Sequence, residues 1–258
     1  MKKFLCCLVI ITALFCSPAE SNNFVEGWQS LNISCDCVEF NGQKFNRVLA
    51  VGDIHGQFSR FMSMYKKLNV SDRDLVIFLG DYIQGKKTGE ELKTIQWLME
   101  QSRRENFILL SGNKEREFLR DNNKNWALLR ELNNVNDPEL TKKVYEFFAG
   151  LKFYQELTID GRDFVFAHAG INDDGTINPN DEFSLMFNKR FCRNYHGNKF
   201  VVIGHRPTQS EFGKKITVPV KVSGKNILML DTNCKRKKGY SSCVNILTGE
   251  FWQSDKDF

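Results

Sequence analysis

Six side chains that could bind a metal ion follow short apolar runs of this 258-residue chain, each within two residues of a glycine. They are Asp53, His55, Asp81, Asn113, His168 and His205. Carboxylate, imidazole and amide oxygen together suit a borderline divalent ion such as manganese, iron or zinc, whereas calcium prefers oxygen ligands alone. An aspartate that bridges two such ions would hold them roughly 3.5 to 4 Å apart, the spacing of two-metal hydrolases. We expect Asp81 to be this bridge.

Each of these side chains, taken singly, has an ordinary structural explanation. The aspartates and the asparagine could cap helices, and His168 or His205 could be a hydrogen-bonded histidine of the core. All six together are much harder to explain in this way. A site for two metal ions is therefore the favoured interpretation.

Three copies of one strand–helix pattern must position the first four of these side chains. The predicted strands are 48–51, 75–79 and 107–111, and the helices that follow them are 59–68, 88–102 and 115–132. Strand, polar residue and helix in succession are typical of a mainly parallel sheet, in which ligands lie at the carboxyl ends of the strands. We therefore expect Asp53, Asp81 and Asn113 to converge.

The second half of the chain has a different pattern of short strands with short connections. Asp160-Gly161 predicts a hairpin turn, and a helix is expected at 138–148. The predicted strands are 153–159, 164–166, 200–203, 216–222, 227–230 and 242–247. These strands predict a second, antiparallel or mixed sheet that faces the first. The fold class is α/β with α+β elements: two facing mixed sheets flanked by helices.

Length and composition indicate one globular domain. A hydrophobic fraction of 41% can supply a core, which a disordered chain lacks. The net charge of +5 is mild and spread over many segments, so we expect no binding to nucleic acid. We expect a single domain over 47–258, preceded by a mixed polar arm over 20–46 that contains a short hairpin at Asn41-Gly42.

The first residues resemble a secretory signal peptide. Lys2 and Lys3 precede an uncharged apolar run, and small residues follow from Ser17 to Ala19. The run is shorter than the roughly 20 residues of a membrane span. An uncleaved anchor, a lipoprotein modified at Cys16 and a buried helix are the alternatives. We expect cleavage after 1–19, no stable membrane anchor afterwards, and a secreted or periplasmic protein.

Five cysteines follow the expected cleavage site, so at least one stays unpaired within the chain. In an exported protein Cys234 and Cys243 could bridge the arms of one hairpin, and Cys35 or Cys37 could fix the N-terminal arm. A zinc site at Cys35-Asp36-Cys37 is disfavoured because no second pair matches it.

Several blocks resemble the calcineurin-like metallophosphoesterases. They are Gly52-Asp53-Ile54-His55-Gly56-Gln57, Gly80-Asp81-Tyr82, Gly112-Asn113-Lys114-Glu115, 165–170, 201–208 and 230–233. Their separations look most like those of serine/threonine protein phosphatases and their bacterial relatives, which include symmetrical dinucleoside tetraphosphatases. The resemblance covers 47–253 and implies a four-layer fold with the dimetal site at the carboxyl ends of strands.

The resemblance also implies a role for each ligand. Asp53, His55 and His205 would hold the first ion, and Asp81 would bridge. Asn113 and His168 would join Asp81 around the second ion. A hydroxide between two ions, Mn²⁺ being expected with iron or zinc as alternatives, would attack phosphorus directly, without a phosphoenzyme. The implied substrate is a phosphorylated protein or a small phosphoester.

Three positions depart from the family pattern. The aspartate and arginine of the second block are replaced by Gln84 and Gly85, and the histidine of the third block is replaced by Lys114. In the family these groups assist the leaving oxygen and grip the phosphate. Lys114 is expected to supply positive charge at the leaving group. Arg206, Lys86 or Lys87 is expected to replace the family arginine that binds the phosphate.

Two functions compete because of these replacements. An active phosphoesterase is favoured, since loss of general acid assistance slows hydrolysis by about 100- to 10,000-fold without removing the metals. A metal-binding pseudophosphatase, which binds phosphorylated ligands without efficient turnover, is the alternative. A dinucleoside polyphosphate hydrolase is a further possibility, because these substrates share one metal core.

Other polar residues are weaker candidates. Lys189 or Arg190 could face the substrate, as basic residues of the comparable stretch do in bacterial relatives, or lie on a solvated helix face. The basic run 235–238 is expected at a hairpin tip in solvent, with an acidic partner or a phosphorylated substrate as the alternative. His196 is expected at the surface.

Overall fold

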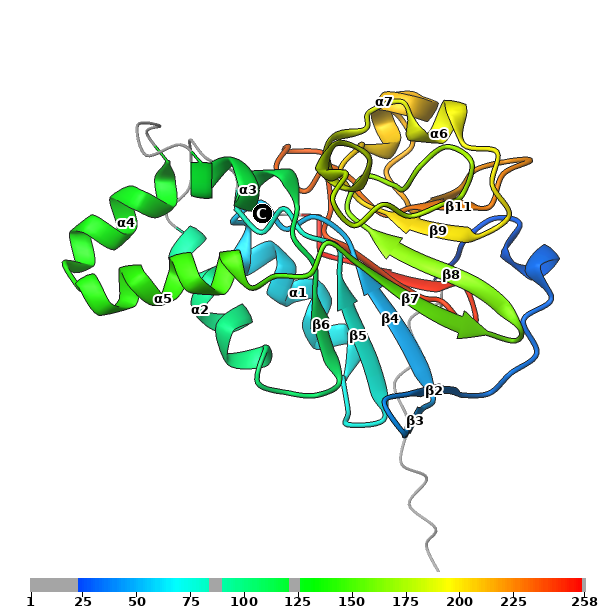
Figure 1. Cartoon of the computed structure of the whole chain (residues 1–258), viewed down its shortest axis with the longest axis horizontal. Helices are drawn as coiled ribbons and strands as arrows, with labels where there is room; N and C mark the ends of the chain where they lie inside the picture. Colours follow the sequence, from blue (N-terminus) through cyan, green and yellow to red (C-terminus); the bar gives the residue numbers. More distant parts are fainter. Residues whose placement is uncertain (1–22, 84–89, 121–125, 257–258) are drawn as a thin grey trace, which may run out of the picture.

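Two facing β-sheets organise the chain in the computed structural model, which describes residues 23–83, 90–120 and 126–256 (Figure 1). The first sheet contains β1 (Asn23–Phe24), β4 (Arg47–Val51), β5 (Asp74–Phe78), β6 (Phe107–Leu109), β12 (Ser242–Asn245) and β13 (Glu250–Gln253). The second contains β7 (Tyr154–Ile159), β8 (Arg162–Ala167), β9 (Phe200–Ile203), β10 (Val220–Lys221) and β11 (Ile227–Met229). Their orders are β1-β13-β12-β4-β5-β6 and β10-β11-β9-β8-β7. Both sheets are mixed, as the sequence predicts.

The three predicted strand–helix units are present. Strands β4, β5 and β6 are parallel neighbours, and each leads into a helix. The helices of this half are α1 (Phe58–Leu68), α2 (Glu91–Gln101), α3 (Asn113–Arg120), α4 (Ala127–Val135) and α5 (Pro138–Ala149). The single helix expected over 115–132 is therefore α3 and α4, and residues 121–125 lie outside the described residues.

The apolar side chains form three layers of core around the two sheets. Strand residues such as Val48 and Ile77 from the first sheet meet Phe166 and Val202 from the second between the sheets. Helices α1, α2 and α5 cover the outer face of the first sheet. The short α6 (Phe191–Asn194) packs on the outer face of the second sheet, and α7 (Thr208–Phe212) lies near it. This alternation of helix, sheet, sheet and helix is the predicted four-layer fold.

The last predicted strand lies in a different sheet from the one expected. Strand β12 pairs antiparallel with β4 of the first sheet rather than joining β11, and β13 pairs with β12 in turn. The sequence did not predict β13. Of the strand expected over 216–222, only β10 forms. Short apolar runs predict strands well, but their pairing partner depends on contacts between distant segments.

The N-terminal segment packs against the sheets. Trp28 and Leu31 are buried in the core between the sheets, and β1 pairs with β13. The hairpin β2 (Val38–Phe40) and β3 (Gln43–Phe45) turns at Asn41-Gly42, as predicted. The expected signal peptide, 1–19, lies outside the described residues. Within the described ranges no helix is long and apolar enough to span a bilayer.

The cysteines beyond the expected leader carry free thiols. Cys234 and Cys243, which could have been joined across a hairpin, are both buried and form no disulfide. Cys35, Cys37 and Cys192 are also free: Cys192 is buried, Cys35 half-buried and Cys37 exposed. The prediction of a Cys234–Cys243 bridge is therefore wrong. Cys243 lies in β12 on the helix-covered face, whereas the thiol of Cys234 donates to the carbonyls of Asp53 and Ile54 at 3.1 and 3.2 Å.

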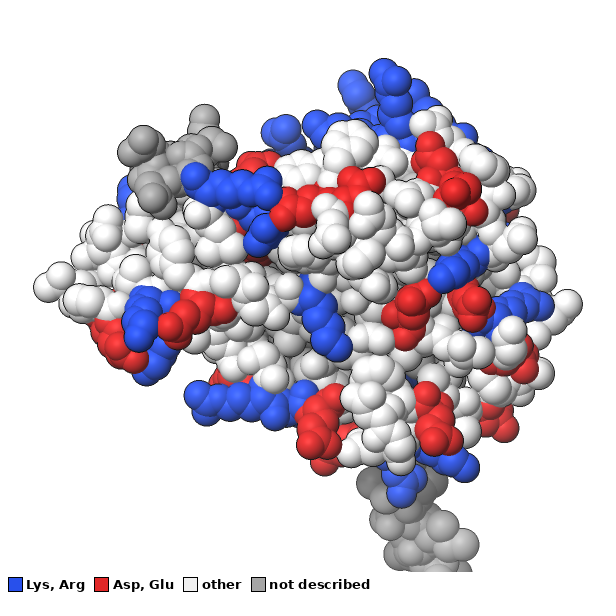
Figure 2. Space-filling model, in the orientation of Figure 1, with Lys and Arg blue, Asp and Glu red and all other residues white. Residues whose placement is uncertain are grey.

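Charged side chains of both signs are interspersed over the face in Figure 2, apart from a group of Lys and Arg at its upper edge, over α6 and α7. The mild net charge of +5 therefore does not gather into one broad basic stripe on this face.

Candidate metal centre

All six predicted ligands lie at the carboxyl ends of strands from both sheets. Asp53 and His55 follow β4, Asp81 follows β5, and Asn113 opens α3 after β6. From the second sheet, His168 follows β8 and His205 follows β9. All except His205 are almost fully buried. Asp53, Asp81 and His168 form a buried group whose ligand atoms lie within 4.8 Å of one another.

The two carboxylate oxygens of Asp81 face different histidines. Its Oδ2 lies 3.7 Å from His55 Nε2, which is itself 3.4 Å from Asp53 Oδ2. Its Oδ1 lies 3.3 Å from His168 Nε2, which is 3.2 Å from Asn113 Oδ1. One carboxylate therefore lies between two groups of ligands, which is the geometry expected of a bridge between two ions.

His205 lies with the second of these groups. Its Nδ1 is 3.0 Å from Asn113 Oδ1, and its ring centroid is 5.0 Å from that of His168. Only its backbone amide reaches Asp53, donating to Oδ1 at 3.0 Å. The resemblance grouped His205 with Asp53 and His55, whereas these contacts group its imidazole with Asn113 and His168.

The backbone at the centre is held in an uncommon conformation. His55, Asp81 and His205 have φ angles of 51°, 52° and 60° in the left-handed region. Such residues cluster at functional sites, where the surrounding structure must hold them. The glycines beside them leave room for the carboxylates, because a Cβ at Gly112 would collide with Asp81 and one at Gly204 with Asp53.

Glu115 holds the loop that carries Asp81. Its fully buried carboxylate accepts hydrogen bonds from the backbone amides of Asp81, Tyr82, Ile83 and Gly112 at 2.9, 2.8, 3.3 and 2.8 Å. Burial and the negative charge of Asp81 raise the pKa of Glu115 to about 7. The sequence analysis quoted this residue within a block but assigned it no role.

Backbone carbonyls hold the Nδ1 atoms of two histidines, on the ring side that faces away from the carboxylates. His168 Nδ1 lies 2.8 Å from the Leu79 oxygen, and His55 Nδ1 lies 3.3 Å from the Ile83 oxygen. These contacts leave both Nε2 atoms directed at the carboxylates. Such outer contacts orient metal-binding histidines in proteins.

The protonation states of Asp53 and His205 suit a metal ion. Burial opposes protonation of His55, but its contacts with Asp53 and Asp81 outweigh burial and raise the pKa of His55. Burial opposes ionisation of Asp53, but His55, His168 and the His205 amide outweigh it and lower the pKa of Asp53 to about 2. Burial and the neighbouring His168 lower the pKa of His205 to about 4. Ionised carboxylate and neutral imidazole are the forms that bind metals. Asp53 Oδ2 and His205 Nε2 are buried and, among the described residues, have no hydrogen-bond partner.

The family model for calcineurin-like phosphoesterases matches residues 46–230, which is well over half of the chain. The chain belongs to this family. Two solved structures support the fold. One, described as a putative diadenosine tetraphosphatase, has a TM-score of 0.56 and 18% identity, over 80% of this chain and 92% of that one.

The second is a protein serine/threonine phosphatase from Saccharomyces cerevisiae with similarity to human phosphatase PP5. It has a TM-score of 0.53 and 14% identity, over 76% of this chain and 71% of that one. At such identities the likeness shows the fold alone. As a member of this family the chain is a metal-dependent hydrolase of the phosphoesterase class, and the buried Asp53, Asp81 and His168 fit its metal requirement.

Both basic residues predicted to act on the phosphate are paired with carboxylates. The Lys114 ammonium contacts both oxygens of Glu117 at 3.2 and 3.0 Å. Arg206 Nε donates to Glu211 at 2.6 Å. Their catalytic roles stay predictions, since each would have to exchange its partner for the substrate. Gln84, Gly85, Lys86 and Lys87 lie outside the described residues.

Lys235 reaches the metal centre, which the sequence analysis did not predict. It is half-buried, and its Nζ lies 3.2 Å from His55 Nε2, whereas Arg236, Lys237 and Lys238 are exposed. The Cys234 thiol holds the start of this loop against the carbonyl of Asp53. The expected solvent position is therefore wrong for Lys235 and right for the next three residues. The available signal in the sequence was that Lys235 lies two residues after the last resembling block, 230–233.

Proposed function

We propose that this calcineurin-like phosphoesterase is an exported enzyme that hydrolyses phosphate monoesters with two bound manganese ions, phosphoserine and phosphothreonine being candidate substrates. The observation that carries the proposal is the position of Asp81, whose two oxygens face His55 and His168 at 3.7 and 3.3 Å. When bound, two such ions would activate water for attack and neutralise charge on the phosphate. The apolar leader-like segment after Lys2 and Lys3 supports export.

The protein's own residues have distinct tasks in this proposal. Asp53 and His55 hold one side of the centre, and Asn113, His168 and His205 hold the other. The Glu115 carboxylate keeps the Asp81 loop in place through its backbone amides. Lys235 supplies a cation close to the first ligand group. This cation could replace the family arginine, whose place in the sequence is taken by Gly85.

The test is metal analysis combined with phosphate release. We expect the purified chain to bind two Mn²⁺ ions, and to release phosphate from an activated aryl ester only when metal is present. Chelation should remove both properties, and added Mn²⁺ should restore them. Metal binding without phosphate release above the chelated control would instead indicate a binding protein that lacks efficient turnover.

Lys235→Gln should weaken phosphate binding. We expect the inhibition constant of inorganic phosphate to rise about tenfold, because a charge-assisted contact to the anion is lost. Bound Mn²⁺ should not decrease, since the ligands remain. Lys237→Gln, an exposed lysine of the same loop, is the matched control and should behave as the wild type. Equal inhibition constants for the two variants would contradict the role of Lys235.

A further inference from the structure

A groove of about 830 Å³ lies between the edge strands of the two sheets. Strand β1 ends the strand order of the first sheet and β10 that of the second, and both line the groove. The remaining lining includes residues of the segment 212–219, at the end of α7 and after it. Its described lining contains none of the candidate metal ligands. We call this set of lining residues the edge groove.

Apolar side chains are exposed at the edge groove. Phe24, Phe212 and Val218 line it and are 50%, 40% and 38% exposed. Phe251 and Pro219, which also line it, are buried. Five large apolar side chains are exposed in the described part of the chain, and three of them therefore lie at this groove. Exposed apolar groups gathered in one place are typical of an interaction site.

Lysines accompany these apolar side chains. Lys214 and Lys215 are exposed in the loop after α7, and Lys221 of β10 lines the groove itself. Figure 2 shows Lys and Arg side chains gathered over α6 and α7. Among the described lining residues, Glu26 is the one acidic side chain. The groove therefore has a mainly basic border, which favours an anionic occupant.

The described chain also begins at this groove. Asn23 lines it, and Asn23 follows the end of the apolar leader-like run, Phe15, by eight positions. Eight extended residues span at most about 28 Å. While the leader lies in the bilayer during the proposed export, the edge groove is thus held close to the membrane surface. This argument rests on the proposed export, whereas the apolar and basic side chains of the groove do not.

A polypeptide that adds a strand to one of the sheets is the competing occupant. The edge strands β1 and β10 have only two residues each, and Pro219, directly before β10, has no amide hydrogen. Such short edges offer few backbone groups to an added strand. The exposed apolar side chains and the lysines remain, and these are the groups that an anionic bilayer surface attracts.

We infer that the edge groove binds the surface of a bilayer that contains anionic lipids. Phe24, Phe212 and Val218 enter the boundary between the head groups and the acyl chains. Lys214 and Lys215 lie at the level of the lipid phosphates. Binding is reversible, because a few interfacial side chains hold a protein far more weakly than a transmembrane helix does. The inference goes beyond the proposed function and requires no turnover.

The test is cosedimentation of the purified chain without its leader, 20–258, with lipid vesicles. We expect vesicles of phosphatidylcholine with about 30% phosphatidylserine to bind it about tenfold more tightly than phosphatidylcholine alone, because anionic lipids attract the lysines. Raised salt should weaken this binding, because it screens the charges. Equal binding to both kinds of vesicle would overturn the inference.

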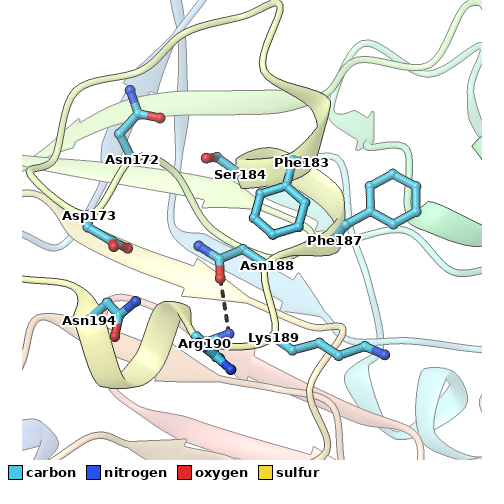
Figure 3. A pocket seen from close by; sticks show the side chains of 9 residues that line it. All are labelled: Asn172, Asp173, Phe183, Ser184, Phe187, Asn188, Lys189, Arg190 and Asn194. Atoms are coloured by element: carbon cyan, nitrogen blue, oxygen red, sulfur yellow. Dashed lines mark hydrogen bonds between the residues drawn. The ribbon is translucent and has the colours of Figure 1, made fainter.

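Two substitutions test the apolar contribution. Phe24→Ala and Phe212→Ala should each weaken binding to the anionic vesicles about fivefold, because a partly exposed ring no longer enters the bilayer. Phe183→Ala is the matched control and should bind as the wild type. Phe183 is 63% exposed, in a separate cavity whose lining is mostly polar (Figure 3). An unchanged urea midpoint checks that each variant is folded. Equal losses in Phe183→Ala and Phe24→Ala would contradict the inference.

A paired substitution tests the charges. Lys214→Gln combined with Lys215→Gln should weaken binding to the anionic vesicles about tenfold or more. Lys142→Gln combined with Lys143→Gln removes two neighbouring lysines of α5, whose side chains are 67% and 56% exposed, and should have no such effect. Equal losses in the two pairs would indicate an effect of net charge alone and would rule out the edge groove as the contact.

A soluble peptide of alternating Glu and Phe is the probe for the competing occupant. Binding of this peptide without binding to vesicles would indicate a polypeptide partner and would also overturn the inference. Loss of phosphate release in the hydrolysis test would leave vesicle binding unchanged. The two proposals therefore fail separately.

Discussion

Asp81→Asn should leave the fold intact and lower kcat/KM for an activated phosphate ester by about 1,000-fold or more. Asparagine keeps the oxygen that accepts from the Lys114 amide at 2.9 Å, and it tolerates the left-handed backbone at φ 52°. It has no second anionic oxygen, so the two ligand groups lose their shared carboxylate. The value of kcat/KM, measured by steady-state kinetics, and the amount of bound Mn²⁺ should both fall.

Asp160→Asn is the matched control. Asp160 has the same φ of 52° but lies in the turn between β7 and β8, away from the metal centre. We expect unchanged kinetics and metal content. Wild-type activity in Asp81→Asn would exclude Asp81 as a bridge, and so would equal losses in both variants.

Glu115→Ala should reduce the free energy of unfolding by about 4 kcal/mol or more, because four buried amides lose their acceptor at roughly 1–3 kcal/mol each. This is a large part of the stability of a typical domain. Urea denaturation of the metal-free protein measures it. Glu115→Gln keeps one carbonyl oxygen and should lose about half as much.

Glu146→Ala provides the comparison for a surface carboxylate. Glu146 lies on α5 with a side chain that is 65% exposed, so the change should stay within about 0.5 kcal/mol. If Glu115→Ala were as stable as Glu146→Ala, the hydrogen bonds to the Asp81 loop would not hold it in place.

The convergence of the candidate metal ligands could be predicted because their chemistry and their position are both local signals. Asp53, Asp81 and Asn113 each follow an apolar run that forms a parallel strand, and parallel strands bring their carboxyl ends together. The facing second sheet could be predicted from its short connections. These features depend on the pattern of apolar residues and on residues close together in the chain, and both can be read from a single sequence.

Other features depend on contacts between distant segments. No local pattern shows that β12 pairs with β4 rather than with β11, because both partners are apolar strands. Lys235 looks like the three exposed basic residues after it, and only the fold of its loop against Asp53 brings it to His55. The His205 ring lies beside Asn113 and His168 rather than beside His55, and this too depends on how the two sheets are placed relative to each other.

The ligands come from both sheets, and this has a thermodynamic consequence. Asp53 and His205 are separated by 152 positions along the chain, so an unfolded chain cannot present them together. Ions that bind only the folded chain stabilise it, by about 2.7 kcal/mol at a concentration one hundred times the dissociation constant. Metal ions at this centre would thus hold the two sheets together. The melting temperature of the protein should therefore rise with the concentration of free metal ion.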